Sequence, residues 1–157
     1  MDTTIQITNP SFDDEEPITA GRRPRVLVVD DDDDMRALVA SALSSDGYRV
    51  TEARDGSDAL DMMRITGRVP DAIVTDVCMG DVSGLSLLAA LRDEGCMTPI
   101  IVMTAFGDEQ VRGEALRLGA DAIFDKPIDI EDLRIVVMNV LRPNDGPRAF
   151  ANTLTDE

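Results

Sequence analysis

The sequence predicts a doubly wound α/β domain, in which helices cover both faces of a parallel sheet. Five short runs rich in Val and Ile alternate with segments of helical periodicity between residues 25 and 142. Continuous apolar runs of this length are typical of strands that are buried on both faces. Hydrophobic residues make up 43% of the 157 residues, which is enough to fill the core of one domain.

The five apolar runs are the predicted strands. The first, third and fourth are apolar almost throughout, as the central strands of a parallel sheet require. Each run is followed by a segment long enough to form a helix, so the chain consists of five strand–helix units. The predicted strands are 25–30, 48–53, 71–76, 99–104 and 121–125.

The helical repeat is clearest after the first strand and at the end of the domain. Apolar residues recur there at intervals of three and four, which places them on one face of a helix. Asp-Gly and Leu-Gly pairs mark the ends of several elements. The repeating residues are Met35, Leu38, Val39, Ala42 and Leu43 in the first helix and Ile130, Leu133, Val137, Val140 and Leu141 in the last.

The two ends of the chain lack this pattern. Residues 1–24 contain five acidic residues and three prolines without apolar periodicity, which predicts a flexible acidic arm. Residues 143–157 begin with a proline that would stop the last helix, which predicts a short tail. The folded domain is therefore expected at 25–142.

Charge and composition exclude several classes of function. Fifteen basic and 31 acidic residues give a net charge of -16, which argues against binding to nucleic acid or to anionic membranes. No apolar run approaches the roughly 20 residues of a membrane span. Two cysteines do not make a disulfide framework, so a reducing cytoplasm is expected. The absence of histidine removes any mechanism that needs an imidazole of this chain.

Charged and polar residues stand where the predicted strands end. Asp30 and Asp31 close the first strand, Asp76 the third and Thr104 the fourth, and Lys126 directly follows the fifth. The carboxyl ends of parallel strands meet at one edge of the sheet, where ligands of such domains bind. Three carboxylates held together there repel each other, so they need a cation or raised pKa values. Oxygen ligands favour a hard ion, and Mg²⁺ is the simplest choice.

Part of this pattern has a purely structural explanation. Asp33 and Asp34 suit the N-terminus of a helix, where capping and the helix dipole favour acids. Asp76 or Thr104 alone would be unremarkable. Lys126 is more informative, because it is the only lysine beside fourteen arginines. Its compact ammonium would fit a small site that a guanidinium would not.

These residues, in this order, resemble the receiver domain of two-component response regulators. The stretches that carry the resemblance are VLVVDDDDDMRALV, PDAIVTDVCMGDVSGLSLLAALR, PIIVMTAFGDE and LGADAIFDKPI. They cover 25–142, essentially the whole predicted domain. The resemblance implies a flavodoxin-like (βα)5 fold with five parallel strands in the order 2-1-3-4-5.

The resemblance also implies a role for each residue at the strand ends. Asp76 is expected to be the phosphoacceptor, and Mg²⁺ is the expected cofactor. The expected metal ligands are Asp30, Asp31, Asp76 and the main-chain carbonyl of Cys78, and the expected phosphoryl-binding residues are Thr104, Ala105 and Lys126.

The sequence departs from the family pattern in two places. Gly80 stands where a proline is usual, and Ile123 stands where an aromatic residue usually takes part in switching. Switching is therefore expected to depend on the loop at Thr104–Phe106. Phe106 and Cys78 each lie two residues after a site residue, and we expect them to shield the phosphoryl group from water and to prolong its lifetime.

The function implied by the resemblance is that of a stand-alone response regulator in the cytoplasm. It would take phosphoryl groups from a histidine kinase or a histidine phosphotransfer protein and would then switch a surface that binds an unidentified downstream protein. A phosphorylation-dependent homodimer is a further expectation. The protein would not be an enzyme beyond its own phosphorylation and slow dephosphorylation, and it would contact neither nucleic acid nor membrane.

Two other functions remain open from the sequence. A degenerate receiver would bind partners without being phosphorylated. An aspartate-nucleophile phosphohydrolase of the haloacid dehalogenase type also places Asp after a first strand, but there the paired acids come late in the chain rather than first.

Overall fold

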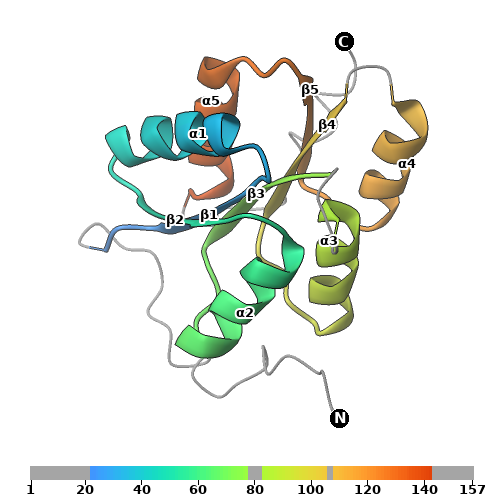
Figure 1. Cartoon of the computed structure of the whole chain (residues 1–157), viewed down its shortest axis with the longest axis horizontal. Helices are drawn as coiled ribbons and strands as arrows, with labels where there is room; N and C mark the ends of the chain where they lie inside the picture. Colours follow the sequence, from blue (N-terminus) through green and yellow to red (C-terminus); the bar gives the residue numbers. More distant parts are fainter. Residues whose placement is uncertain (1–21, 78–82, 106–107, 143–157) are drawn as a thin grey trace.

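A computed structural model of the chain describes residues 22–77, 83–105 and 108–142. Its centre is a sheet of five parallel strands in the order β2-β1-β3-β4-β5 (Figure 1). The predicted fold class and strand order are confirmed, and each strand begins and ends within one residue of its predicted position. The strands are β1 Arg25–Val29, β2 Arg49–Ala53, β3 Ala72–Asp76, β4 Ile100–Ala105 and β5 Ala122–Lys126.

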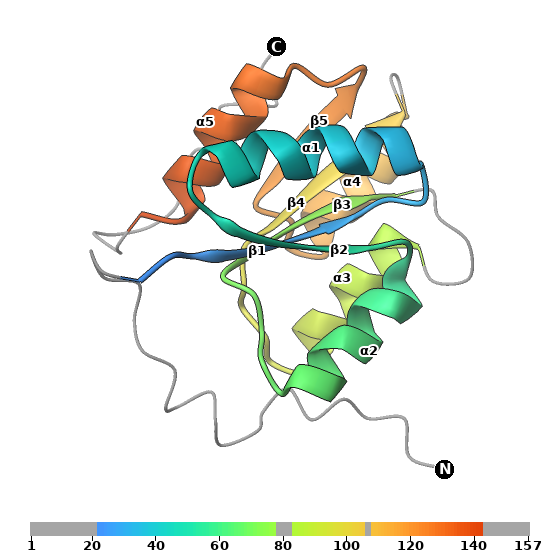
Figure 2. The ribbon, with the colours of Figure 1, turned by 60° about the vertical axis from the view of Figure 1, so that its left-hand side comes forward.

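Five helices cover the two faces of this sheet. Figures 1 and 2 show α1 and α5 on one face and α2, α3 and α4 on the other. None of the helices in the described ranges is long and apolar enough to cross a membrane. The helices are α1 Asp33–Ser45, α2 Gly56–Thr66, α3 Gly84–Asp93, α4 Glu109–Arg117 and α5 Ile130–Val140.

Each face of the sheet builds its own hydrophobic core. Successive strand residues point to opposite faces, so Val26 and Val28 pack with α1 and α5, whereas Leu27 and Val29 pack with α2 and α3. Because both faces are covered, β1 and β3 are buried almost throughout, as their continuous apolar sequences predict. This leaves the strand ends as the places where polar side chains can gather.

The prediction for the apolar face of α1 is wrong at Leu38, whose side chain is 51% exposed. The buried residues are Val39, Ala40 and Leu43. At 100° per residue, Leu38 lies about 120° away from the midpoint between Val39 and Leu43, too far round the helix to reach the sheet. The predicted face of α5 holds better, because Leu133, Val137, Val140 and Leu141 are all buried.

Candidate functional site

The backbone holds Asp30 firmly at the end of β1. Its N–H donates to the carbonyl of Ala53 at 3.1 Å, and its own carbonyl accepts from Arg36 Nη1 at 2.8 Å. Its Oδ1 accepts from the N–H of Asp32 at 2.9 Å. Asp32 in turn caps α1 by accepting from the N–H groups of Asp34 and Met35. The acidic run therefore turns the chain from β1 into α1 and fixes the Asp30 carboxylate in the interior.

Three carboxylates converge beyond the ends of β1 and β3. Oxygen atoms of Asp30, Asp31 and Asp76 all lie within 4.8 Å of one another. Asp30 and Asp76 are buried, whereas Asp31 is exposed. The register explains this meeting, because Val29 of β1 pairs with Thr75 of β3 and each is followed by its site aspartate. The sequence-predicted cluster thus exists in space.

Lys126, at the end of β5, is the cation of this site. Its Nζ lies 3.2 Å from Asp76 Oδ1 and 3.6 Å from Asp30 Oδ2. The Lys126 side chain is 28% exposed, whereas the side chain of Asp76 is buried. The peptide bond between Lys126 and Pro127 is cis.

The charges of the site are not balanced. Burial raises the pKa of the Asp76 carboxyl, and neighbouring Asp30 raises it further, although Lys126 and the N–H of Val77 partly oppose this. Burial by itself lowers the pKa of the Lys126 ammonium, but the carboxylates of Asp76 and Asp30 outweigh this effect and the net pKa is raised. One ammonium thus faces more negative charge than it can neutralise.

The imbalance is clearest at one atom, Asp30 Oδ2. It is a buried oxygen with no hydrogen-bond partner among the described residues, since Lys126 Nζ at 3.6 Å is too distant to donate. Leaving a buried charged oxygen without a donor is costly. A cation bound by the three carboxylates would remove that cost.

Thr104 and Ala105 lie at the same edge, whereas the predicted switch residue Ile123 does not. Thr104 is buried near the end of β4, and the next residue, Ala105, is exposed and pairs in register with Lys126. Ile123 is buried in the core under α3 and α4, and Phe124 packs on the opposite face. The predicted residues Cys78 and Phe106, and the departure at Gly80, lie outside the described residues.

Three further residues support the site, and none of them is assigned a role from the sequence. Arg36 joins Asp30 to Asp33 and Glu52, and the buried Thr75 hydroxyl donates to the Asp76 carbonyl at 3.0 Å. Gly84, at the start of α3, is the third of these residues. Its role is steric, because a Cβ there would overlap the Asp76 carbonyl oxygen and lie 2.9 Å from the carbonyl carbon. For Arg36, the only signal in the sequence is Asp33, an acid three residues earlier on the same helix.

A family model for the response regulator receiver domain matches residues 26–138, which is most of the chain. This chain belongs to the response regulator receiver domain family. The family assignment made from the sequence is therefore confirmed, and with it the connection to two-component signalling.

Curated bacterial relatives support the same assignment. Response regulator MprA of Mycobacterium sp. (strain KMS) is 40% identical over 135 residues, which cover 84% of this chain and 58% of that protein. MprA of Mycobacterium tuberculosis (strain ATCC 25177 / H37Ra) is 39% identical over 135 residues, with the same coverage. The chain thus spans little more than half the length of these relatives.

Solved receiver domains have the same architecture. The receiver domain of Francisella response regulator 1452 superposes with a TM-score of 0.70 at 34% identity, covering 76% of this chain and 97% of that one. The chemotaxis protein CheY4 of Vibrio cholerae superposes with a TM-score of 0.69 at 30% identity, covering 76% and 99%. These neighbours share the receiver-domain fold with this chain.

The raised pKa of Asp76 predicts that Asp76→Asn stabilises the metal-free protein at neutral pH. Between the unfolded and folded pKa values the native state binds more protons, so wild-type stability falls as the pH rises through that window. Asn does not titrate, so the free energy of unfolding of the variant should exceed that of the wild type by on the order of 1 kcal/mol at pH 7.5. This difference should shrink as the pH falls towards 3.8, the ordinary pKa of an Asp side chain.

Urea unfolding of both proteins in EDTA at several pH values measures this difference. Asp34→Asn is the control, because Asp34 is exposed in the first turn of α1. An Asp76→Asn protein that is less stable than wild type at pH 7.5, or a gain that does not change with pH, would contradict the assignment of a repulsive buried carboxylate.

Proposed function

We propose that this receiver domain is a phosphoacceptor in which Asp76 takes a phosphoryl group from a phosphohistidine of a partner protein. The observation that carries the proposal is the position of the Asp76 carboxylate, 3.2 Å from Lys126 Nζ and beside the buried Asp30. Family membership supports the same role. Since this chain contains no histidine, the phosphohistidine must come from a kinase or phosphotransfer protein.

The carboxylate cluster fits a hard divalent cation. Its donors are all oxygen, it carries an excess of negative charge, and it leaves one buried oxygen of Asp30 without a donor. Asp30, Asp31 and Asp76 would hold Mg²⁺, with the main-chain carbonyl of Cys78 as a further ligand implied by the family. The ion would supply charge neutralisation for the incoming phosphoryl oxygens.

The protein residues then perform a displacement at phosphorus. A carboxylate oxygen of Asp76 forms a bond to phosphorus as the bond between phosphorus and the partner's imidazole nitrogen breaks, and that nitrogen keeps the electron pair. The product is an acyl phosphate on Asp76. The domain mainly positions the groups and stabilises charge, so the reaction needs no general base of this chain.

Lys126 and Thr104 would bind the transferred group. The Lys126 ammonium already contacts Asp76, so it is placed to follow a phosphoryl oxygen once the carboxylate is esterified. Thr104 and the exposed Ala105 lie at the adjacent strand end. Their interaction with the phosphoryl group would move the segment after β4.

A switch would follow from this movement. The segment after β4 leads into α4, which an ion pair at 2.6 Å between Arg112 and Asp125 joins to β5. A shift of this segment would therefore alter the surface formed by α4, β5 and α5, which we propose binds a downstream protein. Ile123 is buried in place of the usual aromatic residue, so the change would depend on the backbone rather than on a rotating ring.

Intact-mass measurement after incubation with acetyl phosphate and Mg²⁺ tests the proposed reaction. The wild type should gain about 80 Da, the mass of one phosphoryl group, and Asp76→Asn should gain nothing, because its amide cannot form the acyl phosphate. Asp34→Asn, which removes an exposed acid of α1, should react like the wild type.

The other outcomes separate the remaining functions. Phosphate uptake by Asp76→Asn would overturn the assignment of the acceptor. No uptake by the wild type, also with a panel of phosphorylated kinases, would indicate a receiver that binds partners without phosphorylation. Continuous release of phosphate without an adduct would indicate a phosphohydrolase.

Replacing Lys126 by arginine should impair phosphorylation although the charge is kept. The Nζ atom fits between two carboxylates at 3.2 and 3.6 Å, and a wide guanidinium fork cannot replace this single contact point. The initial rate of adduct formation should fall roughly tenfold or more, which corresponds to about 1.4 kcal/mol of activation free energy. An unchanged rate in Lys126→Arg, with Lys126→Met inactive, would show that only the positive charge matters.

A further inference from the structure

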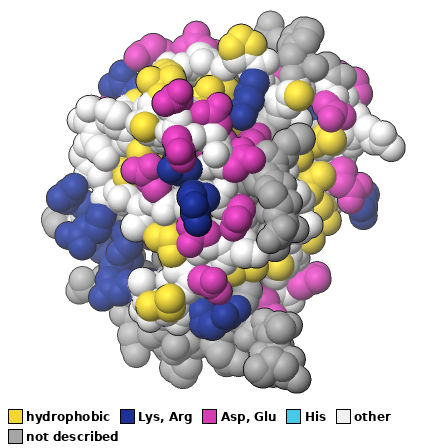
Figure 3. All heavy atoms as spheres, in the orientation of Figure 1, with side chains coloured by type: hydrophobic (Ala, Val, Ile, Leu, Met, Phe, Trp, Pro, Cys, Tyr) yellow, Lys and Arg dark blue, Asp and Glu magenta, His cyan; other side chains and the backbone are white. Residues whose placement is uncertain are grey.

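The end of the sheet opposite to Asp76 is basic, although the protein as a whole carries a net charge of -16. Figure 3 shows basic side chains gathered on the flank where β1 and β2 begin in Figure 1. We call this group of residues the arginine edge. It consists of Arg22, Arg23, Arg25, Arg49 and Arg68, of which Arg22 forms an ion pair with Asp71 at 3.3 Å.

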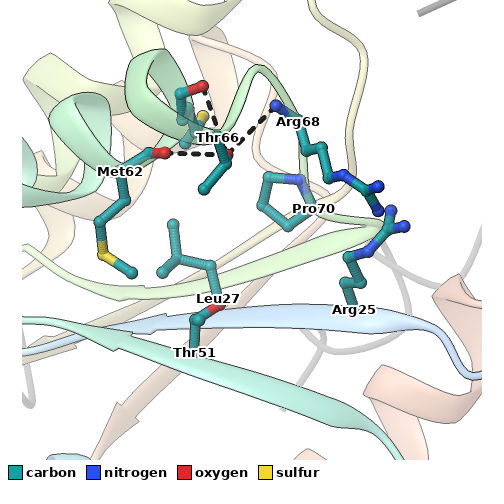
Figure 4. Close-up of a pocket in the computed structure, with 8 residues that line it drawn as sticks. Arg25, Leu27, Thr51, Met62, Thr66, Arg68 and Pro70 are labelled. Carbon is teal, nitrogen blue, oxygen red and sulfur yellow. Dashed lines mark hydrogen bonds between the residues drawn. The ribbon is translucent and has the colours of Figure 1, made fainter. Parts of the chain in front are cut away.

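An apolar pocket of about 110 Å³ opens at the arginine edge, between α2 and the starts of the strands (Figure 4). Leu27 and Met62 form part of its apolar lining. Arg25 and Arg68 line the same pocket, and in Figure 4 their side chains extend on the side of Pro70. A cavity of about 150 Å³ in another protein accepts a benzene ring, so this open pocket has room for most of one aromatic side chain.

The pocket is built on rigid parts of the fold. Leu27 belongs to the interior strand β1 and is only 2% exposed, and Met63, which also lines the pocket, is 5% exposed. The Thr66 hydroxyl donates to the Met62 carbonyl at 2.9 Å and accepts from the N–H of Arg68 at 3.2 Å. These bonds fix the turn that carries Arg68 at the pocket.

An apolar pocket beside several arginines suits a peptide segment in which an aromatic residue is followed by acidic residues. The ring would fill the apolar pocket, and the acids would pair with the arginine edge, where guanidinium groups also suit an aromatic face. The chain contains one such segment before Arg22, namely Phe12 followed directly by Asp13, Asp14, Glu15 and Glu16.

The length of the chain allows this segment to reach the pocket. Phe12 lies ten positions before Arg22, and ten extended residues span up to about 33 Å. A tethered segment also acts at an effective concentration in the millimolar range. A separate acidic partner, by contrast, would have to approach a protein whose net charge repels it at long range.

We propose that residues 12–16 dock on the arginine edge of the same molecule, with the Phe12 ring in the pocket beside Met62. This contact lies at the opposite end of the sheet from Asp76 and does not depend on the proposed phosphorylation. It would give the acidic arm a defined position on the domain and would keep the arginine edge from acidic partners.

Methyl NMR of the full-length protein with ¹³C-methyl methionine tests the contact without phosphodonor. The ring of Phe12 should shift the resonances of Met62 and Met63, so Phe12→Ala should move both while leaving that of Met103, which lies in the other core, in place. Phe150→Ala, which removes the aromatic residue of the C-terminal segment, should move neither. Arg68→Glu should reproduce the effect of Phe12→Ala, and adding Asp13→Arg and Asp14→Arg to it should restore the wild-type shifts.

Each other outcome overturns the proposal. Unchanged Met62 and Met63 resonances in Phe12→Ala would show that the ring is elsewhere. Equal changes in Phe12→Ala and Phe150→Ala would show that the effect is not specific to this segment. Wild-type shifts that disappear on dilution would show that a second copy, rather than the same molecule, occupies the pocket.

Discussion

The interaction on which the site depends is the repulsion between two carboxylates that are buried side by side at one edge of the sheet. Parallel strands deliver Asp30 and Asp76 to the same place, and the backbone around each fixes its position. Lys126 relieves the repulsion only in part, and Asp30 Oδ2 keeps no hydrogen-bond donor among the residues described. Such an arrangement lowers the stability of the resting protein, and it occurs beside two cores that are hydrophobic.

The same repulsion between carboxylates would favour the proposed reaction. A site with an excess of negative charge favours the binding of a cation. The bound cation would in turn reduce the repulsion between a phosphoryl group and the neighbouring carboxylates. In the proposed function, transfer of that group would convert one crowded anion into a larger one with new oxygens, which Lys126 and the ends of β4 and β5 would have to bind. Repacking at this edge would then provide the signal. The opposite edge of the sheet carries a basic cluster, so the two ends of the domain differ in charge as well as in proposed task.

Much of this could be predicted from the sequence because its pattern is local. Continuous Val and Ile runs predicted the buried strands, and the rule that parallel strands end at one edge predicted that Asp30, Asp31, Asp76, Thr104 and Lys126 would meet. The exposure of Leu38 was missed, because apolar spacing gives the period of a helix but not the direction in which it packs. Arg36 and the steric demand at Gly84 were also missed, since both depend on contacts between segments that are distant in the sequence. The pocket beside Met62 required α2 and β1 to be placed in space.

The central claim is that the carboxylate cluster is completed by a divalent cation. Thermal unfolding in increasing Mg²⁺ at constant ionic strength tests it most directly, with Asp31→Asn as the comparison because Asp31 is the exposed member of the cluster. The account predicts a saturable rise in the melting temperature of the wild type, worth about 1.4 kcal/mol at ten times the dissociation constant, and loss of most of this rise in Asp31→Asn. A melting temperature that does not respond to Mg²⁺, or that responds equally in both proteins, would contradict it.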